Sequence, residues 1–163
     1  MCPSDVFLPF ERARFKTRLP RGHFYTAGHM WLHQAEPDLW HVGLTRFALR
    51  MLGEPVDLDF EMALETEVEK GDVVGWLEGF KAVTDLYSPI DGRFAGANPA
   101  LDEGLDAVHR SSYQRGWLFA LRGKVDEDCV DAEGYAAVLE AAIDKVLGEQ
   151  PELAEAEEGA SHG

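Results

Sequence analysis

Short apolar-rich runs follow one another through most of the chain, and several alternate with polar residues as half-buried β-strands do. In residues 55–60, for example, Val56 is expected to face inward with the other apolar side chains, while the aspartates face outward. Turn-forming residues such as Glu36-Pro37-Asp38 separate the runs. The pattern predicts a mainly β protein with strands over residues 24–32, 39–44, 55–60, 73–77, 83–87, 93–98 and 116–121.

Two segments carry helical signals instead. Thr45 can cap a short helix over residues 46–52, which Gly53 would end. A second helix is predicted from Asp131 through Leu147, because its apolar residues recur at steps of three and four and form one stripe. Core packing is the favoured role for that stripe: Tyr135, Val138, Leu139, Ala142, Ile143 and Val146. Residues 102–115 are polar and are expected to form an irregular surface loop.

The two ends of the chain differ in composition from its middle. Residues 1–22 mix aromatic residues, prolines and arginines without a clear period, and we expect an N-terminal extension there. The extension holds the only basic patch of the chain: Arg12, Arg14, Lys16, Arg18 and Arg21. Contact with the acidic surface of the same chain and contact with a partner both remain open. Residues 23–148 are expected to form one domain, and residues 149–163 an acidic, disordered tail.

Charge and length narrow the class of protein. The chain has 163 residues, enough for one domain, with 15 basic and 30 acidic residues and a formal charge of −15. This balance argues against nucleic-acid binding, which depends on neutralising phosphates. Solubility is the favoured explanation for most of the excess of acidic residues. An acidic face that docks on enzymes is a further interpretation. No apolar run approaches the ~20 residues of a membrane span, and no secretory signal is visible, so a cytoplasmic location is expected.

No constellation of residues predicts catalysis or metal binding. Cys2 and Cys129 are far apart and are expected to be free thiols in a reducing compartment. His29 and His33 share a strand face in the predicted structure, but no third ligand accompanies them. Since no Ser/His/Asp or Cys/His arrangement emerges either, a free-standing enzyme is the least favoured class.

The stretch over residues 70–92 contains the most informative local pattern. Its apolar-rich runs, 73–77 and 83–87, are joined by a short segment with a glycine, which predicts a β-hairpin. Lys81 lies at or beside the turn. The hairpin therefore presents a cation on a rigid tip, where a covalent arm could be carried.

The residues around this lysine resemble the lipoyl-lysine hairpin of the H protein of the glycine cleavage system. The shared motif is Glu78-x-x-Lys81-Ala82, followed by Asp85-x-Tyr87-Ser88-Pro89 and Gly92. Residues 25–31, 40–45 and 116–121 match the same family in the same order, so the resemblance covers roughly residues 24–147. Biotin carriers share the fold but usually flank their lysine with methionines. Phe80 and Ala82 therefore favour lipoate over biotin.

The resemblance implies a lipoyl/biotinyl-type flattened β-barrel or sandwich, also called a barrel-sandwich hybrid, with one short and one C-terminal helix. It implies lipoate on Lys81, flanked by the attachment motif Glu78, Gly79, Phe80 and Ala82. Glu78 would be recognised by the lipoylating enzyme, although a solvated turn carboxylate is the alternative. Gly79 departs from the serine that H proteins usually carry. Met30 departs from their usual acidic residue.

By the same resemblance, the protein would be a non-catalytic and monomeric carrier. It would carry an aminomethyl group from glycine decarboxylase to aminomethyltransferase and electrons to dihydrolipoyl dehydrogenase. Two alternatives stay open. One is an H-like lipoyl carrier or lipoyl relay protein of another pathway, such as sulfur oxidation. The other is an unmodified interaction module of the same fold.

Overall fold

The structure is a computed structural model that describes residues 6–149. Cys2 and the tail expected after the last helix lie outside the described residues. The described strands are β1 (Phe7–Arg12), β2 (Phe15–Pro20), β3 (Phe24–Tyr25), β4 (Met30–Glu36), β5 (Leu39–Leu44), β6 (Pro55–Phe60), β7 (Glu67–Val68), β8 (Val73–Gly79), β9 (Val83–Tyr87), β10 (Gly92–Ala97) and β11 (Phe119–Gly123). The helices are α2 (Arg46–Leu52), the 3-10 helix η1 (Pro99–Glu103), α3 (Asp106–Arg110) and α4 (Ala132–Glu149).

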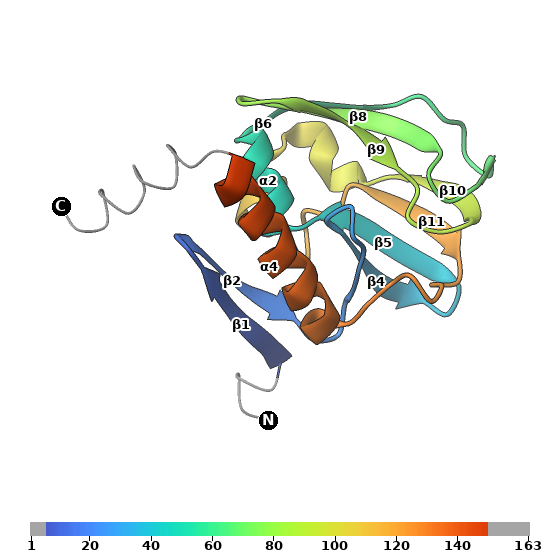
Figure 1. The fold of residues 1–163 in the computed structure, drawn as a ribbon. Helices are drawn as coiled ribbons and strands as arrows, with labels where there is room; N and C mark the ends of the chain where they lie inside the picture. Colours follow the sequence, from blue (N-terminus) through green and yellow to red (C-terminus); the bar gives the residue numbers. More distant parts are fainter. Residues whose placement is uncertain (1–5, 150–163) are drawn as a thin grey trace.

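Two sheets enclose the main core (Figure 1). The larger sheet has the strand order β3-β4-β5-β11-β10-β7, and the smaller one has the order β6-β8-β9. Inward-facing side chains of both sheets form one buried cluster, in which the rings of Phe60 and Phe119 are 5.6 Å apart. Leu77 and Leu86 contribute to it from the smaller sheet, and Val42 and Leu121 from the larger one. The mainly β sandwich predicted from the sequence is thus confirmed.

The N-terminal extension is a β-hairpin rather than a segment without period. Strands β1 and β2 pair antiparallel, and residues 15–20 do alternate between two faces. Phe10, Phe15 and Leu19 are buried in a second cluster with the apolar stripe of α4. Arg12 and Arg21 form ion pairs with Asp144 and Glu133 of α4. The hairpin and α4 therefore stabilise each other, as their adjacent positions in Figure 1 show.

Four other expectations are corrected by the structure. The strand predicted over residues 24–32 is two strands, because a turn with His29 at φ 64° separates β3 from β4. Residues 102–115 are not simply a surface loop, since they include α3 and Val108, which is only 1% exposed. Val56 was expected to face the core, but its side chain is exposed. The last strand begins at Phe119, three residues later than predicted.

Helix α2 has the predicted bounds and caps. The Thr45 side chain accepts a hydrogen bond from the backbone N–H of Ala48, and Gly53 follows the helix at φ 81°. A glycine is favoured at such an angle because it lacks a Cβ. The hydroxyl of Tyr135 lies 2.7 Å from Thr45 Oγ1 and 2.8 Å from His29 Nδ1. Helix α4 thus holds the start of α2.

Candidate functional site

The predicted hairpin is formed by β8 and β9, and Lys81 is at its tip. Glu78 pairs with Val83, and the backbone N–H of Gly79 donates to the carbonyl of Ala82 at 2.9 Å. The loop between the strands is therefore tight. Lys81 and Ala82 are exposed, and the Phe80 side chain is 76% exposed, so the tip projects into solvent.

The tip is held by backbone hydrogen bonds to the chain that follows α2. The Lys81 N–H donates to Leu52 O at 2.8 Å, and the Ala82 N–H donates to the same oxygen at 3.3 Å. The Phe80 N–H donates to Glu54 O at 3.1 Å. Carbonyls at the C-terminal end of a helix lack partners within the helix, so they are available to fix another segment. Three backbone hydrogen bonds, one each from Phe80, Lys81 and Ala82, therefore fix the backbone of the tip.

Gly79 is required by this contact. A Cβ at Gly79 would lie 2.3 Å from Leu52 O and 2.9 Å from Gly53 O. Nothing larger than hydrogen fits there without moving the tip or the connection after α2. The glycine that distinguishes this motif is therefore coupled to the seating of the tip on α2.

The Lys81 side chain lies along α2, beside a hollow. Its Nζ is 3.4 Å from the carbonyl oxygen of Arg50. The hollow has a volume of about 390 Å³, and its lining includes Phe15, Lys16, Arg46, Arg50, Glu54, Lys81 and His109. Apart from Lys81, the sequence motif gave no signal of these residues, because they come from β2, α2, the segment after α2 and α3, and meet Lys81 only in the folded chain.

The outer face of the smaller sheet is acidic. Glu78 is half-buried and pairs with Asp57 of β6, while Trp76 pairs with both Asp59 and Asp85. Opposite residues of antiparallel strands share a face, so these four carboxylates surround the tryptophan beside the tip. Glu78 is thus a member of an acidic surface next to Lys81.

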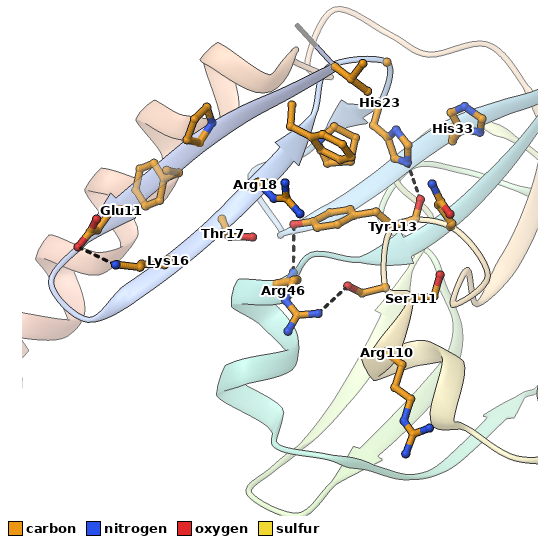
Figure 2. A pocket seen from close by; sticks show the side chains of 18 residues that line it. Glu11, Lys16, Thr17, Arg18, His23, His33, Arg46, Arg110, Ser111 and Tyr113 are labelled. Carbon is orange, nitrogen blue, oxygen red and sulfur yellow. Dashed lines mark hydrogen bonds and ion pairs between the residues drawn. The ribbon is translucent and has the colours of Figure 1, made fainter. Parts of the chain in front are cut away.

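A larger cavity lies away from the hairpin tip, between the N-terminal hairpin and the segment after α3 (Figure 2). Its lining includes His23 and His33, whose rings are 4.6 Å apart, whereas His29 bonds Tyr135 instead. The side chains of His29 and His33 therefore have different partners and do not form a joint binding site. Within residues 6–149, no group of three histidine, cysteine or carboxylate side chains could hold a metal ion.

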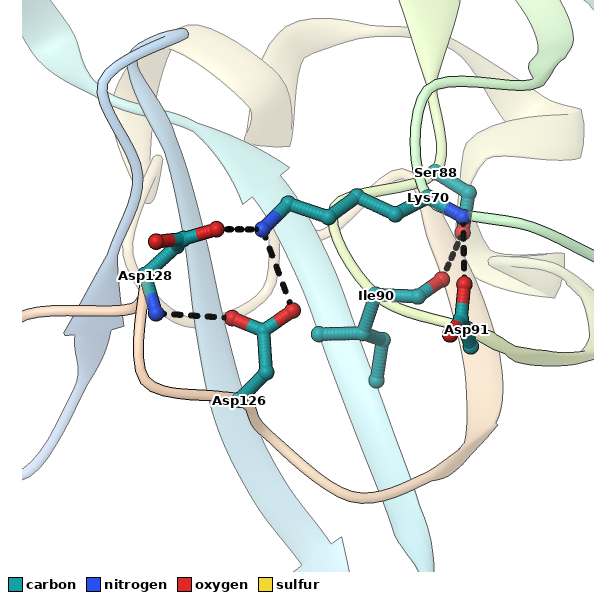
Figure 3. A network of polar contacts seen from close by, with 6 residues as sticks. All are labelled: Lys70, Ser88, Ile90, Asp91, Asp126 and Asp128. Carbon is teal, nitrogen blue, oxygen red and sulfur yellow. Dashed lines mark hydrogen bonds and ion pairs between the residues drawn. The ribbon is translucent and has the colours of Figure 1, made fainter.

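The base of the hairpin is fixed by a polar network around Lys70 (Figure 3). Its Nζ forms ion pairs with Asp126 and Asp128, and the hydrogen bond to Asp128 raises the pKa of Lys70. Its backbone N–H donates to Asp91 Oδ1 at 2.8 Å. Lys70 thus ties the start of β8 to the segment before α4, while Lys81 stays exposed at the other end of the hairpin.

Gly92 begins β10 at the close of the attachment motif. A Cβ there would lie 2.1 Å from Arg122 O. The reason for glycine is close approach of two backbones, since Gly92 is not among the glycines with positive φ. Ser88 of the same motif is buried and donates its hydroxyl to Ile90 O at 2.6 Å. Ser88 and Gly92, at the end of the motif, therefore stabilise the fold.

A β-sandwich that presents a lysine on an exposed hairpin tip is typical of a carrier domain of the lipoyl/biotinyl type. The comparisons with known proteins agree with this class. The family model of the glycine cleavage H-protein matches residues 23–142.

Curated relatives and a solved structure are similar to this chain over nearly their whole lengths. The glycine cleavage system H protein of Bacteroides fragilis is 37% identical over 125 residues, which are 75% of this chain and 98% of that protein. The H protein of Thermus thermophilus is 36% identical over 126 residues, 75% of this chain and 96% of that protein. A crystal structure of the H protein from Mycobacterium marinum superposes with a TM-score of 0.65 at 28% identity, covering 73% of this chain and 97% of that one.

The chain belongs to the glycine cleavage H-protein family. Proteins of this family carry a covalently attached lipoate on a lysine and catalyse no reaction of their own. The protein is thus a non-catalytic lipoyl carrier of the glycine cleavage system, whose partners are glycine decarboxylase, aminomethyltransferase and dihydrolipoyl dehydrogenase. No helix of the described residues is long and apolar enough to cross a membrane.

Proposed function

We propose that Lys81 is the residue that carries the lipoyl group. One observation supports this proposal most: Lys81 is exposed on a hairpin tip whose backbone is hydrogen-bonded to Leu52 and Glu54. A fixed backbone leaves the motion to the side chain and its arm. The attachment point is then presented in the same way to each enzyme.

The residues around Lys81 fit such a group. The Nζ atom contacts only a carbonyl oxygen, Arg50 O at 3.4 Å, so acylation breaks no ion pair found among the described residues. Attachment of lipoate converts the side-chain amine into a neutral amide. When bound, the lipoyl dithiolane supplies thiol–disulfide chemistry and a sulfur to which an aminomethyl group can be attached. The protein's own part is to hold the attachment point clear of the core.

The flanks of the lysine are proposed to form the surface that the lipoylating enzyme recognises. Phe80 and Ala82 are exposed on either side of Lys81, and Glu78 stands at the edge of the acidic face. Gly79 contributes through the backbone, since its Cα packs against Leu52 O. A modifying enzyme would thus meet an aromatic ring, a carboxylate and a fixed backbone around one amine.

The domain limits and location follow as parts of the same proposal. Residues 23–148 form the carrier domain, residues 1–22 an added N-terminal segment, and the carrier works as a monomer in the cytoplasm. Cys129 is a free thiol whose pKa is raised by burial.

Carrier activity tests the assignment directly. Wild-type, Lys81→Arg and Lys145→Arg proteins, each treated with lipoate and a lipoylating enzyme, are supplied to glycine decarboxylase, and CO₂ release from glycine is measured. Lys145 is an exposed lysine of α4 and provides the matched control. We expect release with wild type and Lys145→Arg and none with Lys81→Arg. Activity of Lys81→Arg above background contradicts the assignment.

A further inference from the structure

The N-terminal hairpin builds one wall of a large cavity. The cavity has a volume of about 1060 Å³ and lies between β1–β2 and the segment that follows α3. Lys16 and Arg18 line it from β2, Arg46 from α2 and Arg110 from α3, and Figure 2 shows these side chains around the same space. Glu11 is the one carboxylate among its lining residues.

The cations of this cavity are poorly neutralised by the chain itself. In the described part of the chain, Arg18, Arg46 and Arg110 take part in none of the seven ion pairs. Lys16 is 3.9 Å from Glu11, a distant and exposed pair. Arg46 Nη1 donates to His109 O at 3.1 Å, a neutral acceptor. A chain with a formal charge of −15 thus keeps a net positive cavity.

This positive cavity neighbours the hollow beside Lys81, because the two share lining residues. Lys16 and Arg46 line both, and Arg50 lines the hollow at the lysine. We call the surface made by Lys16, Arg18, Arg46, Arg50 and Arg110 the basic groove; Glu54 is the carboxylate that lines its hollow at Lys81. The basic groove leads from the N-terminal hairpin to the hairpin tip that carries the arm.

Strand β2 contributes side chains both to the buried cluster with α4 and to the wall of the cavity. Phe15 and Leu19 face the buried cluster with α4, whereas the alternate residues Lys16 and Arg18 face the cavity. The hairpin precedes the residues matched by the family model, which begin at residue 23. About three quarters of this chain spans 98% of the Bacteroides fragilis protein, so the hairpin adds a basic wall beyond the shared domain.

We propose that the basic groove docks an acidic surface of an enzyme that acts on the arm of Lys81, and the proposal rests on the attachment proposed above. An arm anchored at Lys81 must enter the active site of that enzyme, so the surface around the lysine faces the enzyme at each visit. Complementary charges accelerate encounter and fix orientation. The remaining negative charge of the chain disfavours nucleic acid as the occupant.

Two surfaces of opposite charge near Lys81 add an orienting effect. Arg46 and Arg50 line the hollow beside Lys81, whereas Asp57 and Glu78 belong to the acidic face of the smaller sheet. An enzyme with an acidic patch and a basic patch beside the entrance to its active site would bind the carrier in one orientation. Reversed docking would place like charges against each other.

The test uses the full-length protein with four enzymes: the unmodified protein with the lipoylating enzyme, and the lipoylated protein with each of the three partner enzymes. The double variant Arg18→Glu/Arg110→Glu reverses two cations of the basic groove without touching Lys81 or its flanks. We expect the KM for the carrier to rise about tenfold for at least one enzyme with kcat retained, because docking charges act on encounter. The effect should shrink between about 20 mM and about 150 mM salt.

The control variant Arg93→Glu/Lys124→Glu makes the same change in net charge outside the basic groove and should leave KM within about twofold of wild type. Intact mass first establishes that each variant carries the lipoyl group, which separates failure of docking from failure of attachment. If the glutamate variant unfolds, Arg18→Ala/Arg110→Ala replaces it. Wild-type KM values for all four enzymes with a fully loaded variant overturn the proposal, as does an equal rise in the control.

Discussion

The backbone N–H of Lys81 donates a hydrogen bond of 2.8 Å to the carbonyl oxygen of Leu52, the last residue of α2. This bond joins the tip of the lysine hairpin to the end of a helix whose beginning is capped by Thr45. Thr45 in turn contacts Tyr135 of α4. A connected series of polar contacts therefore runs from the C-terminal helix, through α2, to Lys81.

Restoring a side chain at Gly79 should loosen this tip. In Gly79→Ser, the new Cβ would meet Leu52 O at 2.3 Å, so the tip or the connection after α2 must move. We expect a loss of about 1–3 kcal/mol in the free energy of unfolding. Urea unfolding measures the loss, and amide hydrogen exchange at Lys81 should become faster. Unchanged exchange at Lys81 would show that the tip absorbs the side chain without leaving Leu52.

Removing the Tyr135 hydroxyl should weaken the other end of α2. Tyr135→Phe deletes the contacts to Thr45 and His29 inside a buried region. The expected cost is about 1–3 kcal/mol, because the polar partners lose a hydrogen bond without gaining water. Denaturant unfolding provides the value. Amide hydrogen exchange should also become faster in α2. Faster exchange confined to α4 would argue against a link between α4 and α2.

Gly92 should tolerate no β-branched side chain. Its Cβ would approach Arg122 O to 2.1 Å, so Gly92→Val must separate β10 from β11 locally. We expect a loss of about 2–4 kcal/mol, measured as a lower midpoint of thermal or urea unfolding. Gly22→Ala is the matched control, since no atom lies within 4 Å of a Cβ at that position. Equal effects of both changes would refute the backbone-contact explanation.

Stability should fall as the pH is lowered through the range set by His23. Burial lowers the pKa of His23 from 6.5 to about 4, and its Nε2 lies 2.7 Å from Tyr113 O. Between these values the unfolded chain binds a proton that the folded chain does not bind. The free energy of unfolding therefore decreases from about pH 6.5 down to about pH 4, by roughly 3 kcal/mol for this group.

Urea titrations at several pH values measure the decrease. His29 has a pKa that burial also lowers, so it contributes in the same direction. The contribution of His23 is the difference between wild type and His23→Gln, which should be less sensitive to pH over this range. The exposed His109 provides a control substitution, His109→Gln. Identical pH profiles for wild type and His23→Gln would contradict the assignment to His23.

The lysine hairpin could be predicted from sequence because its signals are local. Two apolar-rich runs, the glycine-containing segment between them and the spacing around Lys81 lie within one short stretch, and β8 and β9 pair as expected. The helix over residues 46–52 was equally local, with Thr45 and Gly53 at its two ends. That lipoate is attached at Lys81 itself stays a prediction.

The remaining features depend on contacts between distant segments. Nothing near Gly79 in the sequence points to Leu52, and the reason for the glycine appears only when α2 meets the tip. The alternation of residues 15–20 was obscured by the neighbouring prolines and arginines, although it is what places Phe15 and Leu19 on α4. His29 adopts a positive φ that its residue type does not announce, which divided the first predicted strand.

The most direct test of the central claim is the intact mass of the protein produced with lipoate and a lipoylating enzyme, followed by peptide fragmentation. The account predicts a gain of one lipoyl group located on Lys81, retained in Lys145→Arg and lost in Lys81→Arg. A lipoyl group on another lysine, or no gain while a known H protein is modified beside it, would contradict the claim that Lys81 carries the arm.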